Sequence, residues 1–205
     1  MEKDGPLIPD LIRHTLREPR TAAQRILDMG FEAGFLWQAL LLVVVLSVIA
    51  AQTTALITGA AQQQPGPEML MPEFFSNPML MGIVQGGLLV LVVFAVYWIG
   101  RSFGGTGSFE GAIALVTWLQ FLLVCLQVAQ ALAALVLPPL AGLIGLAGLV
   151  VFFWLLTQFV SQLHGFRSPG MVFTMIVVSM LGIVFALSVV LAIIGVAFVG
   201  EVPDV

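Results

Sequence analysis

Charged residues are scarce in this sequence. They make up 9% of its 205 residues, whereas 60% are hydrophobic. A soluble domain carries roughly 25% charged residues, and no soluble fold of this size could hide so much apolar surface. The composition therefore predicts an integral membrane protein, with the lipid bilayer as its first partner. With a formal net charge of −4, nothing in the chain is basic enough to indicate a nucleic-acid partner.

Side chains that bind metals or perform catalysis are equally rare. Cys125 is the single cysteine, so the chain has no disulfide framework and no cysteine-based metal site. The two histidines do not support a haem site in the bilayer, and no HExxH motif, Ser/His/Asp set or aspartate pair occurs. Proton transfer and catalysis within a membrane normally need ionisable groups facing the bundle interior. We therefore expect a protein that is not an enzyme, with no catalytic residue, no metal and no cofactor.

Long stretches without Asp, Glu, Lys, Arg or His divide the chain into predicted membrane spans. They cover residues 33–67, 74–100, 111–163 and 168–200. A helix needs about 20 apolar residues to cross the hydrocarbon core. The third stretch is about twice that length, and Pro138-Pro139 interrupts it because proline removes backbone donors. The sequence predicts an all-α polytopic membrane protein with five transmembrane helices at 35–58, 79–100, 109–136, 140–163 and 171–198.

The positive charges all fall on one side of this arrangement. They lie in the amino-terminal segment (Lys3, Arg13, Arg17, Arg20, Arg25), after the second helix (Arg101) and after the fourth helix (Arg167). Positive charge marks the cytoplasmic side of a membrane protein. We expect the amino terminus in the cytoplasm and the carboxyl terminus on the opposite side. The predicted domains are a cytoplasmic amphipathic tail at 1–34, a transmembrane domain at 35–200 and a short tail at 201–205.

The amino-terminal tail has the pattern of two short helices. In "PDLIRHTLREP", Leu11, Thr15 and Leu16 share a helical face with other apolar residues, and arginines lie on the opposite side. A second helix could begin at Pro19 and end at Gly30. The pair is predicted to lie at the membrane interface or to pack under the bundle as a plug. A docking role for a cytoplasmic partner is the alternative. The proline-rich segment 60–78 could be a re-entrant turn or a lid.

Uncharged polar and small residues recur within the predicted spans. Four glutamines stand out as pairs on helical faces: Gln120, Gln127, Gln158 and Gln162. Glutamine amides bond across membrane helices, which is the structural interpretation, and a polar groove for lipid headgroups or a small solute is the alternative. Gly142, Gly145 and Gly148 recur at a spacing of three and let backbones approach closely. They predict helix packing, with a homo-oligomer interface as the alternative.

The segment "RSFGGTGSFEGA" at 101–112 is dense in glycine. A P-loop needs a lysine followed by Ser or Thr after its last glycine, and none is present. A dinucleotide fingerprint would place a third glycine where Glu110 stands. The segment instead predicts a helix start, with Ser108 as the N-cap and Glu110 in the first turn. The glycines permit a tight reversal, while His164 and Arg167 at the next inner turn are expected to reach toward water.

The residues on either side of this segment carry a family resemblance. "GGTGSFEGAIALVTWLQ" opens the third span, a proline-broken hairpin follows, and "FWLLTQFVSQLHGFRSPGMVFTMIVVS" leads from the fourth span into the fifth. This order resembles the Yip1 domain family over about residues 10–200. The resemblance implies five membrane helices with a glycine-rich loop before the third. Eukaryotic members carry an acidic cytoplasmic segment with an Asp-Leu-Tyr-Gly-Pro motif and are linked to Rab GTPases and vesicle traffic. This chain lacks that segment and resembles the prokaryotic branch.

The leading functional hypothesis is a non-enzymatic protein of the bacterial inner (plasma) membrane. It would act through an unknown membrane or cytoplasmic protein partner, or by organising lipid. The candidate contact residues are Arg13, Arg17, Arg20, Arg25, Arg101, Ser108, Glu110, His164 and Arg167. The alternatives are a solute or lipid transporter or scramblase that uses the glutamine-lined faces, and an accessory subunit of a larger membrane complex.

Overall fold

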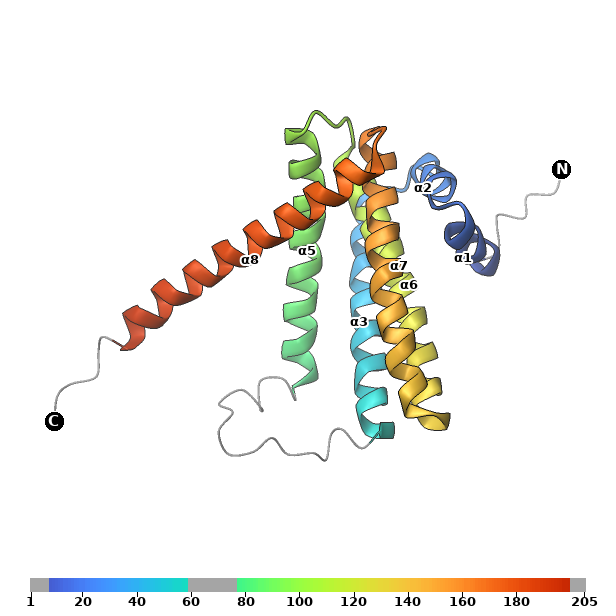
Figure 1. Cartoon of the computed structure of the whole chain (residues 1–205), viewed down its shortest axis with the longest axis vertical. Coiled ribbons are helices and arrows are strands. Elements are labelled where there is room, and N and C mark those ends of the chain that lie inside the picture. The colour runs from blue at the N-terminus through green and yellow to red at the C-terminus, as the bar shows by residue number, and fades with distance from the viewer. Residues whose placement is uncertain (1–7, 59–76, 200–205) are drawn as a thin grey trace. The chain divides into compact units, whose positions relative to one another are not determined.

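The structure, a computed structural model, describes residues 8–58 and 77–199. Its described residues form helices and no strand (Figure 1). The helices are α1 (Ile8–Arg17), α2 (Pro19–Asp28), α3 (Ala33–Thr58), α5 (Pro78–Ser102), α6 (Phe109–Val136), α7 (Pro138–His164) and α8 (Pro169–Val199). The tail at 201–205 and nearly all of the segment 60–78 lie outside the described residues, so the re-entrant turn stays a prediction.

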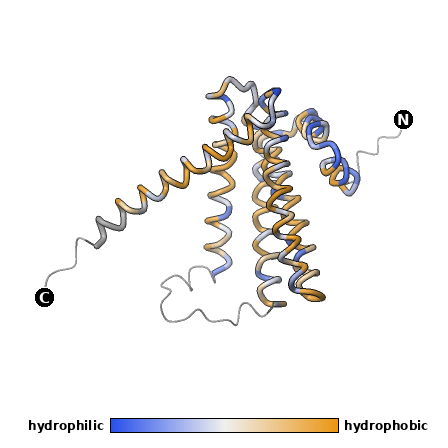
Figure 2. Tube along the Cα trace, in the orientation of Figure 1, coloured by the Kyte–Doolittle hydropathy of each residue, from blue (hydrophilic) through white to orange (hydrophobic). Residues whose placement is uncertain are grey.

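The five predicted spans are confirmed. Within the described residues, five helices are long and apolar enough to cross a membrane: α3, α5, α6, α7 and α8. Figure 2 shows them as mostly hydrophobic along their length, with hydrophilic residues gathered on α1 and α2. Their ends fall within two residues or so of the predicted ends. Pro138 and Pro139 open α7, because the first helical turn has no use for the backbone donors that proline lacks.

The chain divides into two compact units, Met1–Arg167 and Ser168–Val205. The first contains α1 and α2 together with four of the five spans, so the tail helices belong to the same compact body as the bundle. The second contains α8, an apolar helix whose start is supported by the Ser168 hydroxyl, which accepts a hydrogen bond from Met171 N–H at 3.4 Å. The sites described below all lie in the first unit.

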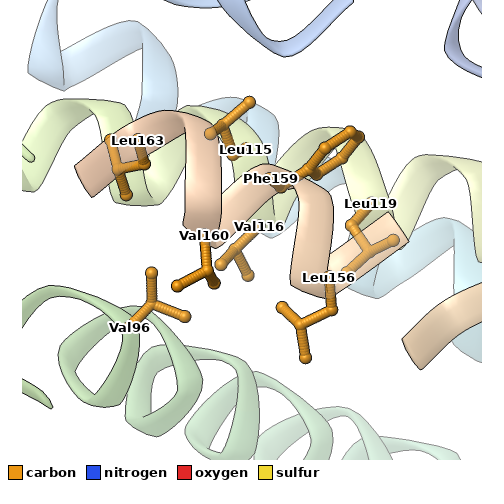
Figure 3. Close-up of a pocket in the computed structure, with 8 residues that line it drawn as sticks. All are labelled: Val96, Leu115, Val116, Leu119, Leu156, Phe159, Val160 and Leu163. Atoms are coloured by element: carbon orange, nitrogen blue, oxygen red, sulfur yellow. The ribbon is translucent and has the colours of Figure 1, made fainter. Parts of the chain in front are cut away.

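Helix α6 is the centre of the first unit. It contacts α3, α5, α7 and α2, and the side chains of its first half are largely buried. Its partners at one level are shown in Figure 3, where apolar side chains from α5, α6 and α7 converge. They enclose a void of only about 10 Å³, lined by Val96, Leu115, Val116, Leu119, Leu156, Phe159, Val160 and Leu163. That space is at the lower limit for a single water molecule, so this part of the core is tightly packed.

One polar network ties three of the spans together. Gln85 of α5 donates from Nε2 to the Ser47 hydroxyl of α3 at 2.8 Å, and that hydroxyl donates to Gln127 Oε1 of α6 at 3.1 Å. Ser47 is almost fully buried. Because neither lipid nor apolar side chains can replace these bonds, the network favours one rotational setting of each helix.

Small residues bring α6 and α7 close together. A Cβ atom added at Gly148 would overlap the Leu126 side chain of α6, and one added at Gly145 would lie 2.6 Å from Gln130 Nε2. That same Gln130 amide donates to the Ala141 carbonyl oxygen at 3.3 Å. The predicted packing role is therefore confirmed for Gly145 and Gly148. Gly142 differs, because no atom lies within 4 Å of its added Cβ.

The glycine contrast gives a stability test. Gly148→Val should lower the free energy of unfolding in detergent micelles by about 1–3 kcal/mol, because the added methyl groups overpack against Leu126. Gly142→Val makes the same chemical change in open space and should have a clearly smaller effect. Equal losses in the two variants would contradict close packing at Gly148. Denaturant titration followed by circular dichroism is the measurement.

Candidate functional site

The candidate site is the end of the first unit where α5 and α7 finish and α6 begins, which we call the arginine-bearing end. Arg101 lies in the last turn of α5, and Arg167 follows α7. Local sequence sets the turns here. The Ser108 hydroxyl accepts from Gly111 N–H at 3.0 Å, which confirms the predicted N-cap of α6, and Glu110 lies in the first turn. Gly165 ends α7 in the left-handed conformation, with φ of 71°.

His164 is the buried centre of this end. Its side chain is only 3% exposed. Gly107 N–H donates to Nδ1 at 3.2 Å, so Nδ1 must be an acceptor, and Nε2 carries the proton that it donates to the Val96 carbonyl oxygen at 3.0 Å. A backbone hydrogen bond adds to these contacts: Thr106 N–H donates to the His164 carbonyl oxygen at 3.4 Å. The imidazole thus links α5, the α5–α6 loop and α7.

Three glycines make room for this ring. A Cβ atom at Gly100 or Gly105 would overlap His164, and one at Gly107 would lie 2.8 Å from its Cε1 atom. The sequence predicts that the glycines permit the reversal between helices, a role that Gly104 fits with its φ of 86°. The prediction that His164 reaches toward water is wrong, because these side-chain-free positions let the loop close over the ring. Arg167, by contrast, is exposed as predicted.

An aromatic cluster at the same end was not predicted. The Phe109 ring lies 5.2 Å from that of Phe94, 5.4 Å from that of Tyr97 and 6.3 Å from that of Trp37, measured between centroids. It therefore joins α3, α5 and the start of α6. The Arg101 guanidinium lies 5.6 Å from the Tyr97 ring centroid, a cation–π contact. The available signal was the tendency of Trp and Tyr to gather where spans meet the membrane interface.

The tail helices are bonded to the side of α7. Arg20 Nε donates to Gln158 Oε1 at 2.8 Å, and Gln162 Nε2 donates to Gln24 Oε1 at 2.8 Å. The same helix also contributes apolar contacts, because Ala22, Ala23 and Ile26 of α2 are buried. The apolar face of α2 is thus turned against protein, as the plug interpretation predicted.

Helix α1 adds a contact with α6. Trp118 Nε1 donates to the buried Thr15 hydroxyl at 3.1 Å, and that hydroxyl donates to the Leu11 carbonyl oxygen at 2.7 Å. The buried face of α1 is narrower than predicted, because Ile8 and Leu16 are exposed. Thr15 is buried because it satisfies the indole N–H of Trp118, a pairing that helical periodicity alone does not reveal.

The predicted contact residues fall into two groups. Arg13, Arg17, Arg25, Arg101, Glu110 and Arg167 are exposed. The others have structural partners: Ser108 caps α6, His164 is buried, and Arg20 is half-buried against Gln158. Within the described residues, no three His, Cys, Asp or Glu side chains gather as a metal ion would require.

The four glutamines of the predicted polar groove have separate environments. Gln127 bonds to Ser47 of α3, whereas Gln158 and Gln162 bond to α2. Gln120 is buried in α6. The structure does have a groove of about 630 Å³ between α3 and α5, but its lining is almost entirely apolar and includes none of the four glutamines.

The His164 contact can be tested through a glycine. Gly105→Ala should lower the free energy of unfolding by about 1–3 kcal/mol, because its methyl group would lie 2.6 Å from the His164 Cβ and Cγ atoms. Gly87→Ala, in α5, has no atom within 4 Å of the added Cβ and should stay within about 0.5 kcal/mol of the parent. Thermal and denaturant unfolding in micelles would measure both. A Gly105→Ala protein as stable as the Gly87→Ala protein would contradict the close contact.

Comparison with known proteins gives one match. The Yip1 domain family matches residues 13–202, which is nearly the whole chain. No curated protein and no solved structure matches the chain. The matched region takes in α6, the glycine-rich loop before it and the turn after α7, where the resemblance was recognised in the sequence. The chain therefore belongs to the Yip1 domain family and is a multi-pass membrane protein with five helices able to span the bilayer.

Proposed function

We propose that this protein is a non-enzymatic component of the bacterial inner membrane that binds a cytoplasmic protein through its arginine-bearing end and the tail helices bonded to α7 beside it. The observation that carries the proposal is the attachment of α2 to α7 through the Arg20–Gln158 and Gln24–Gln162 hydrogen bonds. Because of this attachment, the arginines on the tail are held beside the bundle. A surface presented on a folded support pays less ordering entropy on binding than a flexible segment does.

The exposed arginines are the feature of this surface that a partner would bind. Arg13, Arg17 and Arg25 of the tail helices are exposed, as are Arg101 and Arg167 at the helix ends, and exposed carboxylates such as Glu18, Asp28 and Glu110 lie among them. The partner we propose therefore presents acidic groups at the positions that face the arginines. Exposed charges of this kind act mainly on association rate and on partner choice.

The proposed orientation follows from the same charges. All Lys and Arg residues lie in the tail or at the inner ends of the second and fourth spans, so the positive-inside rule favours a cytoplasmic amino terminus. The bacterial assignment is supported by the resemblance to the prokaryotic branch of the family.

The structure gives no support for transport through the glutamine-lined faces as a second function. Three of the four glutamines are engaged in bonds between helices, and the groove between α3 and α5 is apolar. Such a lining suits hydrocarbon and offers a polar solute few hydrogen-bond partners.

The partner proposal is tested by neutralising the exposed tail arginines. A variant carrying Arg13→Gln, Arg17→Gln and Arg25→Gln should lose most of its crosslinked cytoplasmic partner, because the side chains keep their length but not their charge. Crosslinking in cells, gentle solubilisation and quantitative mass spectrometry measure the loss. Point changes are preferable to deleting the tail, since α2 buries apolar residues against the bundle.

A charge-preserving variant provides the control. The triple Arg→Lys variant at the same positions should retain the partner if net charge is what the partner recognises. Unchanged crosslinked partners in the Arg→Gln variant would overturn the docking role of the tail, provided that circular dichroism shows the helical content of the parent.

A further inference from the structure

We propose that Arg20 forms a binding site for the phosphate of an anionic phospholipid in the leaflet at the arginine-bearing end. The site comprises Arg20 of α2, with Gln158 and Trp154 of α7. It differs from the exposed arginine surface offered to a protein partner, and neither proposal depends on the other.

The Arg20 guanidinium is only partly satisfied within the protein. Its Nε atom donates to Gln158 Oε1, a neutral acceptor, at 2.8 Å. Its Nη2 atom is buried and has no hydrogen-bond partner in the structure. No carboxylate from residues 8–58 or 77–199 forms an ion pair with it. The Arg20 side chain as a whole is only half-buried, so part of the guanidinium can still be reached from outside the protein. A guanidinium that bonds to a neutral amide and to no carboxylate can bind an anion with oxygen acceptors.

The depth of the site selects lipid as the source of that anion. Gln158 lies six residues before His164, where α7 ends, which corresponds to about 9 Å along the helix axis. The 27 residues of α7 give it a length of about 40 Å, against a hydrocarbon core of about 30 Å. Gln158 is therefore near the boundary between hydrocarbon and headgroups. A phospholipid phosphate at that level can meet the accessible part of the Arg20 guanidinium where it lies, whereas a folded cytoplasmic protein would have to enter the bilayer.

The surface of α7 next to the site suits the rest of a lipid. Trp154 precedes Gln158 by four residues, so it lies one helical turn deeper on the same face. Its side chain is 39% exposed. Tryptophan is enriched at the membrane interface, where its ring is apolar and its N–H can meet polar groups. An acyl chain whose phosphate binds Arg20 would pass along this indole.

Charge distinguishes the lipid class. Arginine forms charge-assisted hydrogen bonds with phosphate oxygens, and its planar fork allows two at once. In a zwitterionic lipid the headgroup cation competes for the same phosphate. A phospholipid with net negative charge is therefore the expected ligand, and phosphatidylglycerol is a suitable probe.

The test counts bound lipids on the full-length protein. Delipidated protein in mild detergent is titrated with phosphatidylglycerol or phosphatidylcholine, and the complexes are resolved by native mass spectrometry. The parent protein should hold one phosphatidylglycerol more tightly than any phosphatidylcholine. Arg20→Gln should weaken that binding by roughly tenfold, since one charge-assisted contact is lost. Arg17→Gln removes the same charge from an exposed position and should change the affinity less than about twofold.

A second variant separates lipid binding from a merely structural role for Arg20. Gln158→Glu keeps the arginine in place and supplies an internal carboxylate, so it should preserve or raise thermal stability while lowering phosphatidylglycerol affinity. A structural role alone would leave lipid affinity unchanged in this variant.

Three outcomes would overturn the proposal. Equal weakening by Arg20→Gln and Arg17→Gln would mean general electrostatic attraction. Full displacement of the tight lipid by millimolar inorganic phosphate would identify a site for free anions. Loss of a crosslinked protein in Arg20→Gln cells, with unchanged lipid affinity, would assign the residue to a protein partner. Persistence of phosphatidylglycerol binding in excess phosphate supports the lipid assignment.

Discussion

The burial of one imidazole ring organises the arginine-bearing end. His164 accepts a hydrogen bond from Gly107 N–H and donates one to the Val96 carbonyl oxygen, so it provides partners for a backbone group of the α5–α6 loop and for one of α5. Its ring is held where Gly100, Gly105 and Gly107 leave space. With this ring in place, the α5–α6 loop is closed, Ser108 can cap α6, and the central helix begins at a defined level beside α7.

The tail helices depend on that arrangement. They attach to the outer faces of α6 and α7 through Trp118, Gln158 and Gln162, all of which lie within a few turns of the closed loop. Apolar burial by α2 supplies contact area, and the polar bonds fix which residues face each other. The arginines of the tail then fall into two groups: Arg13, Arg17 and Arg25 are exposed, and Arg20 is half-buried against α7.

Local features could be predicted from the sequence, and long-range pairings could not. The spans follow from stretches without charge, the start of α7 from Pro138-Pro139, and the cap of α6 from Ser108, because each depends on neighbouring residues alone. The burial of His164 depends on glycines more than 50 positions earlier in the chain. The Arg20–Gln158 bond spans 138 positions. The glutamines had two open interpretations because a helical face does not reveal its partner. The bonds of Gln127, Gln158 and Gln162 match the structural one.

The hydroxyl of Ser47 has a wider consequence for assembly. It accepts a hydrogen bond from the Gln85 amide and donates one to the Gln127 side-chain oxygen, so a single hydroxyl distinguishes its two neighbours as donor and acceptor. Leucine-rich surfaces adhere to almost any other apolar helix, and a newly inserted span therefore meets many tolerable but incorrect partners. An atom that must accept from one side and donate to the other rejects most of them. Mutual recognition among α3, α5 and α6 is thereby encoded in three side chains, without a charge that would hinder insertion.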